Sequence, residues 1–188
     1  MIPASLAHCH LESLPKKKHS VVVITADVRR KKLLCVEVHI EGKGHSEASI
    51  AVEHLSSLSE RVLMIKKFYG YGAFDQSPLF DKLHSLDIEP VIRMRKNASA
   101  EYARGSKFRR WKVREYKNMG YERWSSLNSY GMRWPGTEGI FSAVKRKFGE
   151  NTVSKLLVNL ECEGYQRFLA YDELREYGER NATSGGTL

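Results

Sequence analysis

Four residues in the last third of the chain could act together on a phosphate group. They are Tyr130, Arg133, Glu138 and Lys145. At about 100° per residue, a helix places Glu138 and Lys145 on nearly the same bearing, two turns apart. A carboxylate can bind a metal ion there while a neighbouring cation holds a phosphate. An ordinary amphipathic helix with a solvated charged face has the same spacing, so both interpretations stay open.

The helix that would hold these side chains has an apolar stripe of its own. Ile140, Val144 and Phe148 recur at helical spacing, and such a stripe can face a core. The sequence therefore predicts a helix that is anchored on one side and presents an acid and a base on another.

A second carboxylate, Asp27, directly follows a predicted buried strand. Residues 21–26 are rich in β-branched side chains, which favour a strand. Phosphodiester chemistry with two divalent ions needs acidic oxygens that converge on one point, and carboxylates suit Mg²⁺ or Mn²⁺. An aspartate at the end of a strand can equally open a turn.

The patterns along the rest of the chain predict a single α/β domain. A charged turn at residues 29–32 separates the first predicted strand from the next, which favours a hairpin. We also expect strands at residues 33–40, 62–65 and 88–92, helices at 47–58 and 78–86 with Ser77 as N-cap, and irregular structure at 1–18.

Residues 93–124 mix cations with aromatic rings. Lysine and arginine neutralise phosphates, and aromatic rings can stack on unpaired bases. The alternative is a solvated helix whose aromatic side chains, such as Phe108 and Trp111, pack inward. The candidates for DNA contact in this segment are Arg109, Arg110, Lys112 and Arg114.

The composition favours an anionic partner. The formal net charge is +9 and the sequence pI is about 9.5, which point to nucleic acid first. The three cysteines are dispersed and form no CxxC pair, so the sequence suggests neither a zinc site nor a disulfide framework. With no apolar run long enough for a membrane span and no secretory signal, we expect a cytoplasmic protein.

Three pieces of the chain resemble a known family. They are YGMRWPGTEGIFSAVKRKFGE at residues 130–150, GAFD at 72–75 and RKNA at 95–98. From about residue 21 to residue 178, the chain resembles the catalytic domain of DDE-type insertion-sequence transposases. The resemblance implies an RNase H-like α/β fold with a central mixed β-sheet flanked by helices. It implies a catalytic domain at residues 19–178, in which the basic aromatic segment 93–124 is a DNA-contact insert. From the residues themselves we expect the segment 1–18 to be irregular and the tail at 179–188, with its serine, glycine and threonine residues, to be disordered.

The resemblance also implies roles for single residues. Glu138 takes the place of the third catalytic acid, and Tyr130, Arg133 and Lys145 take those of the residues that handle DNA phosphates. Four residues separate Arg133 from Glu138, where three are usual. Asp27 takes the place of the first acid, which in the family ends the first strand. Asp27 and Glu138 would then bind Mg²⁺ or Mn²⁺, two ions in the family, for cutting element ends and for strand transfer.

Tyr71 stands where the family has its second acid, just before the GAFD piece. A tyrosine is neutral near pH 7 and is a poor ligand for Mg²⁺. Asp75 lies four residues further on, but the matching aspartate of the family is not a metal ligand. We therefore expect a DNA transposase family member with impaired catalysis.

The segment before the first predicted strand is short and shows no helix-turn-helix pattern. This predicts an N-terminally truncated copy of such a transposase. The alternative is a non-catalytic DNA-binding remnant, or a regulator of an intact transposase. The expected partners are DNA and either further copies of this chain or intact transposase subunits, with no membrane.

Overall fold

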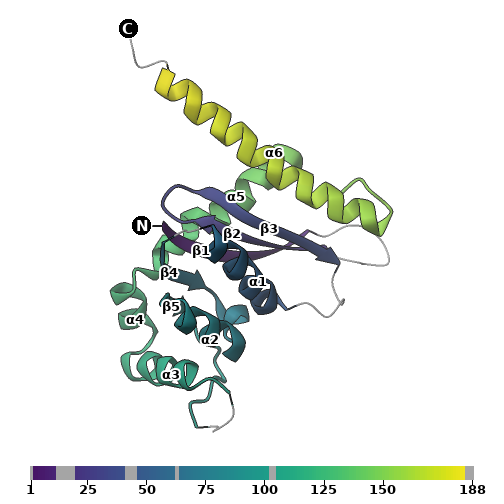
Figure 1. The fold of residues 1–188 in the computed structure, drawn as a ribbon. Helices are drawn as coiled ribbons and strands as arrows, with labels where there is room; N and C mark the ends of the chain where they lie inside the picture. Colours follow the sequence, from purple (N-terminus) through teal and green to yellow (C-terminus); the bar gives the residue numbers. More distant parts are fainter. Residues whose placement is uncertain (1, 12–19, 41–45, 62–63, 102–104, 185–188) are drawn as a thin grey trace.

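The computed structural model describes residues 2–11, 20–40, 46–61, 64–101 and 105–184, and the fold is mixed α/β (Figure 1). The strands are β1 (Ile2–Leu11), β2 (Ser20–Asp27), β3 (Lys32–Ile40), β4 (Ile65–Gly70) and β5 (Glu89–Ile92). The α-helices are α1 (Glu47–Glu60), α2 (Ser77–Ser85), α3 (Lys107–Met119), α4 (Tyr121–Leu127), α5 (Arg133–Phe148) and α6 (Leu157–Ser184). Two short 3₁₀ turns are η1 (Gly72–Phe74) and η2 (Tyr130–Met132).

The strands form one mixed sheet in the order β3-β2-β1-β4-β5. β2 is antiparallel to both β3 and β1, whereas β1, β4 and β5 run parallel to one another. The hairpin predicted from the charged turn is therefore confirmed as β2–β3. The edges of the sheet are β3 and the four-residue strand β5.

β1 corrects the prediction that residues 1–18 are irregular. Ile2–Leu11 is a strand, while residues 12–18 lie outside the described part. Its alanine, serine, histidine and cysteine residues give a weak strand signal, but β1 pairs with β2 on one side and with β4 on the other. This pairing overrides the local preference. The strand that ends at Asp27 is consequently the second strand and not the first.

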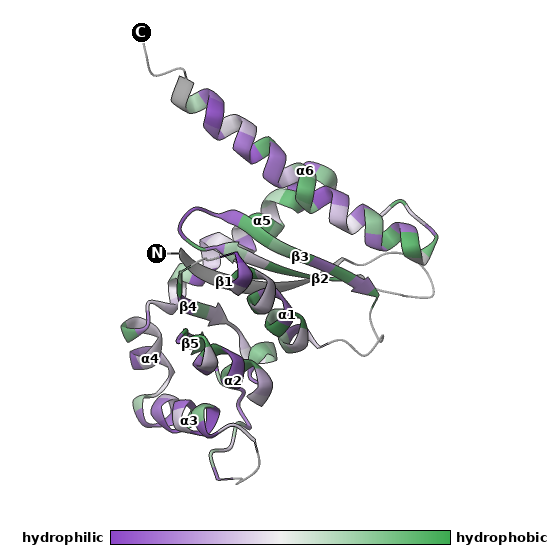
Figure 2. Cartoon of the chain, viewed as in Figure 1, coloured by the Kyte–Doolittle hydropathy of each residue, from purple (hydrophilic) through white to green (hydrophobic). Residues whose placement is uncertain are grey.

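Helices cover both faces of the sheet. Successive side chains of a strand point to opposite faces, so one strand contributes to both cores. On β2, Val21 and Val23 belong to a core that includes side chains of α1, α2 and α3. Val22 and Ile24 pack instead with side chains of α5 and α6. Figure 2 colours α3 as mostly hydrophilic, in keeping with Val113 as its buried residue.

The long helix α6 packs on β3 and continues past the sheet (Figure 1). At 1.5 Å per residue its 28 residues span about 42 Å. Gly164 allows the close approach, since a Cβ there would lie 2.9 Å from Val38 Cγ1. Because α6 reaches Ser184, the predicted disordered tail is wrong for residues 179–184, and residues 185–188 lie outside the described part. None of the described helices is long and apolar enough to cross a membrane.

The remaining predicted elements are found with small shifts. Those at residues 33–40, 47–58 and 88–92 match β3, α1 and β5 to within two residues. The strand predicted at 62–65 begins at Ile65 and runs on as β4, with residues 62–63 outside the described part. Helix α2 begins at Ser77, so Gln76 is its N-cap and the assignment of Ser77 as the cap is wrong.

Candidate nucleic-acid interface

Helix α5 places Arg133 and Glu138 close to the end of β2. Its apolar stripe faces a core, as the sequence predicted, and this core includes side chains of β2 and β3. Gly136 lies so close to the strand end that a Cβ there would be 2.8 Å from the Cα of Val28, the residue after Asp27. The start of α5 is therefore fixed against the chain that leaves β2.

Tyr130 joins the same region to the end of β4. Its buried hydroxyl donates a hydrogen bond to the carbonyl oxygen of Gly70 at 3.2 Å, one residue before Tyr71. Burial raises the pKa of the Tyr130 hydroxyl, although the charge of Arg133 lowers it. The hydroxyl thus remains protonated, as the hydrogen bond requires.

Arg133 and Glu138 form an ion pair beside two aromatic rings. Arg133 Nη1 lies 3.6 Å from Glu138 Oε1. The guanidinium carbon is 5.2 Å from the ring centroid of Tyr130 and 5.9 Å from that of Trp134. The Arg133 side chain is 13% exposed, and its Nε has no hydrogen-bond acceptor among the described residues. Since a guanidinium offers five N–H donors, Arg133 can bind a further anion.

Lys145, predicted to act beside Glu138, lies two turns further along α5. Its Nζ is 3.6 Å from Glu150 Oε1 at the end of the helix. Arg133, and not Lys145, is therefore the cation that pairs with Glu138.

Asp27 is buried and is engaged in the turn that follows it. Its Oδ1 accepts hydrogen bonds from the backbone N–H of Arg29 at 2.9 Å and of Arg30 at 3.1 Å. Its Oδ2 is 4.0 Å from Arg30 Nε. This is the turn-opening role that a strand-end aspartate can take.

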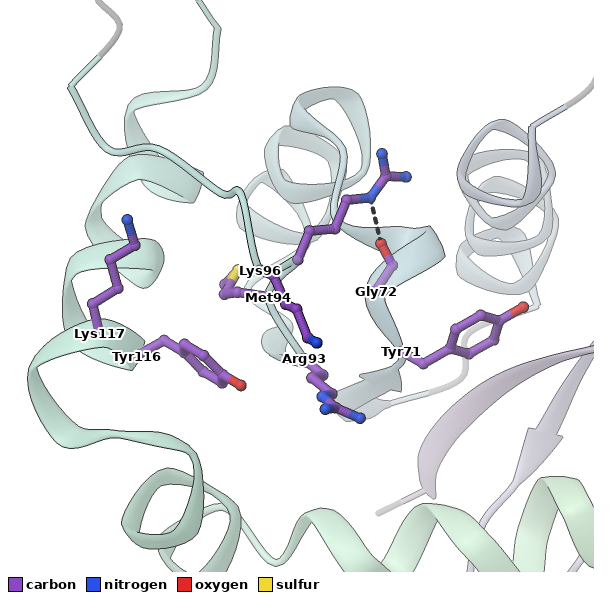
Figure 3. A pocket seen from close by; sticks show the side chains of 8 residues that line it. Tyr71, Gly72, Arg93, Met94, Lys96, Tyr116 and Lys117 are labelled. Carbon is purple, nitrogen blue, oxygen red and sulfur yellow. Dashed lines mark hydrogen bonds between the residues drawn. The ribbon is translucent and has the colours of Figure 1, made fainter.

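Tyr71 and Asp75 are both turned into the protein. The Tyr71 ring packs edge-on against Phe74 with a centroid distance of 5.1 Å, and Figure 3 shows it pointing away from the neighbouring cavity. Asp75 accepts two hydrogen bonds from Arg109, at 2.6 and 3.0 Å, and a third from the backbone N–H of Arg95 at 3.1 Å. A buried ion pair therefore occupies both oxygens of Asp75.

This arrangement does not fit a two-ion metal centre. Asp27, Glu138 and Asp75 each have an arginine partner. Within the described ranges, no group of three or more acidic, histidine or cysteine side chains is arranged so that it could hold a metal ion. Magnesium needs a near-octahedral set of oxygen ligands, and the carboxylates that the sequence offered do not supply it here.

The four cations singled out in the basic segment are used mainly within the protein. Arg109 is held by Asp75. Arg110 Nη1 donates to a backbone carbonyl at 2.9 Å, and Lys112 Nζ lies 2.9 Å from an acid of its own helix. Arg114 is exposed on α3. The structure thus leaves Arg114 as the most accessible of the four.

A basic cavity of about 420 Å³ lies where β4 and β5 end (Figure 3). Side chains from the chain after β5 and from α3 meet there, and Lys96 and Tyr116 point toward Arg93 in Figure 3. The cavity is lined by Tyr71, Gly72, Arg93, Met94, Arg95, Lys96, Tyr116 and Lys117. Its cations belong to the predicted basic segment, but they are not the four chosen as DNA contacts.

A positional signal could have identified these cations. Arg93, Arg95 and Lys96 directly follow the strand predicted at residues 88–92. In sheets with parallel strands, ligands bind outside the carboxyl ends of the strands. Arg95 also closes the loop, because its Nε donates to the carbonyl oxygen of Gly72 at 2.7 Å.

Aromatic rings connect the cavity to the start of α5. The Arg93 guanidinium lies 4.9 Å from the ring centroid of Tyr121, and the ring centroids of Tyr121 and Tyr130 are 6.5 Å apart. Arg133 lies over the other end of this row, on Tyr130. We call Arg93, Tyr121, Tyr130 and Arg133 the cation–aromatic row. Cations at both ends suit phosphates, and the exposed Tyr121 ring can stack on a base, whereas the Tyr130 ring is buried and supports Arg133.

No protein-family model, curated protein or solved structure matches the chain. The chemistry of the site is therefore the guide to its ligand.

Proposed function

We propose that this chain is a DNA-binding domain with an RNase H-like fold, related to DDE transposases, and that its basic cavity holds phosphates of the DNA backbone. The main support is that Arg93, Lys96 and Tyr116 line one cavity at the ends of β4 and β5, where Lys96 and Tyr116 point toward Arg93 (Figure 3). The cations would neutralise phosphates, and the ring would offer a stacking surface. A net charge of +9 attracts a polyanion from a distance.

Two observations support the family part of the proposal. The sheet is mixed and has helices on both faces, which agrees with the arrangement implied by the sequence motifs. Tyr130 bonds to the end of β4 beside Tyr71, and α5 starts against the end of β2. Positions that the resemblance groups at one site therefore lie in one region of the molecule.

In this proposal the domain binds DNA without cutting it. The first strand, β1, contains no acidic residue, and Tyr71 replaces the second acid. Asp27 stabilises a turn at the end of the second strand. Glu138 is then the acid of the motif that remains, and one carboxylate cannot position two metal ions for in-line displacement.

The test is equilibrium binding of a labelled DNA duplex, followed by fluorescence anisotropy in EDTA between about 50 and 200 mM salt. We expect binding that weakens steeply with salt. In the double variant Arg93→Gln/Lys96→Gln, the slope of log K against log salt should shrink by about 1.8, since each lost phosphate contact removes about 0.9.

The matched control is Lys147→Gln/Lys155→Gln, which removes the same charge at exposed positions at the end of α5 and after it. This control should keep the wild-type slope. Absence of DNA binding, or equal loss in both double variants, would contradict the proposed site. Cleavage of DNA by the unaltered chain in Mn²⁺ would contradict the non-catalytic part and favour an active transposase.

A further inference from the structure

The turn between β2 and β3 presents three consecutive cations that the proposed cavity does not include. Arg29, Arg30 and Lys31 are all exposed. Lys31 adopts a left-handed backbone conformation with a φ of 54°, which closes the turn before β3. The cations are therefore displayed at the tip of a hairpin and not along a flat strand.

Asp27 holds the backbone of this turn. Both hydrogen bonds of its Oδ1 go to N–H groups inside the turn, those of Arg29 and Arg30. The Asp27 side chain is 3% exposed, whereas that of Arg30 is 74% exposed. The carboxylate is thus hidden beneath the cations, and its bonds fix the backbone from which they project.

Helix α6 supports the turn, and its acids pair with neighbouring cations, Glu176 with Lys32 and Glu179 with Arg175. Arg175 Nη1 donates to the carbonyl oxygen of Arg30 at 3.3 Å. A cavity of about 420 Å³ lies between the turn and the helix, and cations outnumber acids in its lining. The lining residues are Arg30, Lys32, Arg175, Glu176, Glu179 and Arg180.

This basic turn adjoins the cation–aromatic row. Val28, which precedes Arg29, belongs to the same buried cluster as Tyr69 and Tyr130. Arg29 directly follows Val28 in the chain, so the turn begins at this cluster. A DNA strand held at the cavity and the row would therefore pass close to the turn.

We infer that Arg29 and Lys31 form a second phosphate-contact surface for the same DNA, and that Asp27 is the positioning residue that keeps the turn in shape. The inference rests on the proposed DNA binding and deepens it. Contacts to phosphates at separate points fix the register of a protein on a duplex. Asp27 acts through the turn and does not touch the DNA.

Three variants test this surface in the same salt titration. Arg29→Gln/Lys31→Gln should reduce the salt slope by about 1.8, because two phosphate contacts are lost. Asp27→Asn keeps an oxygen that can accept both backbone hydrogen bonds, so it should bind DNA like the wild type. Asp27→Ala removes that acceptor and should weaken binding with a reduced slope.

The outcomes separate this inference from the proposed function. Loss of slope in Arg93→Gln/Lys96→Gln with an unchanged slope in Arg29→Gln/Lys31→Gln would overturn the second surface and leave the cavity intact. An equal loss of salt slope in Asp27→Asn and Asp27→Ala would overturn the positioning role, because DNA binding would then need the carboxylate charge itself. A wild-type protein that does not bind DNA would overturn both proposals. A reduced slope in folded Asp27→Ala supports the inference, since a purely structural role would change stability and not the slope.

Discussion

Replacing Gly136 by alanine tests the contact that fixes α5 against the end of β2. A Cβ at this position would lie 2.8 Å from Val28 Cα and 3.4 Å from Val28 O, which are backbone atoms, so the helix itself must move. Overpacking of this kind costs about 1–3 kcal/mol. Alanine in place of glycine inside a helix stabilises it by about 0.5–1 kcal/mol. The free energy of unfolding should therefore fall by roughly 1 kcal/mol.

Gly139→Ala is the matched control, because it lies one turn later in the same helix and a Cβ there would meet no atom within 4 Å. This variant should be stabilised by about 0.5–1 kcal/mol. The free energy of unfolding falls by about 2 kcal/mol per molar urea, so the urea midpoints of the two variants should differ by about 1 M. Equal midpoints would refute the close contact with Val28. They would also remove the basis for placing Arg133 and Glu138 at the end of β2.

Further predictions concern a buried histidine, a buried ion pair and the missing acid. Burial lowers the pKa of His54 from 6.5 to about 4. The unfolded chain therefore takes up a proton that the folded chain excludes, and the free energy of unfolding should fall by up to about 3 kcal/mol as the pH drops through this window. Urea unfolding at several pH values would show it, and a His54→Gln variant with the same pH dependence would contradict it. Asp75→Ala leaves the Arg109 guanidinium buried without its partner and should cost about 3–5 kcal/mol in thermal or urea unfolding. Adding Arg109→Met should recover part of this loss, and no recovery would argue against an unpaired charge as the cause. Tyr71→Asp should not create a two-ion site, because Asp27 is held in its turn, and titration calorimetry with Mn²⁺ that gave a stoichiometry of two would refute this.

The sequence predicted α5 and β2 because a short stretch of each contains its own pattern, an apolar stripe at helical spacing in α5 and a run of β-branched residues in β2. The stripe of Ile140, Val144 and Phe148 predicts a helix packed on one face, which is what α5 does. By contrast, β1 has no strong signal of its own and is a strand because of its neighbours in the sheet. That pairing depends on residues far away in the sequence. The sequence alone therefore could not show that the strand ending at Asp27 is the second strand of the chain and not the first.

The sequence indicated the segment that contributes most cations to the candidate cavity, but not which of its residues line that cavity. Arg109 looked like a DNA contact because it lies in a basic helix, but its partner Asp75 is 34 residues away in the sequence. Ion pairs of this kind are set by the tertiary fold and leave no local pattern. Arg93 and Lys96 were in the predicted segment, and their position after β5 distinguishes them once the sheet is known.

The two edges of the sheet are protected against pairing with other chains by different means. Along β3, the hydroxyl of Tyr165 donates to the carbonyl oxygen of Val36, and the carboxylate of Asp172 accepts the N–H of Leu33. Helix α6 thus occupies hydrogen-bonding groups that an added strand would need. At the other edge, β5 is four residues long and includes Pro90, which has no N–H to donate. A chain cut before α6 would expose β3 as an open edge and should aggregate through it, so this helix keeps the sheet from growing.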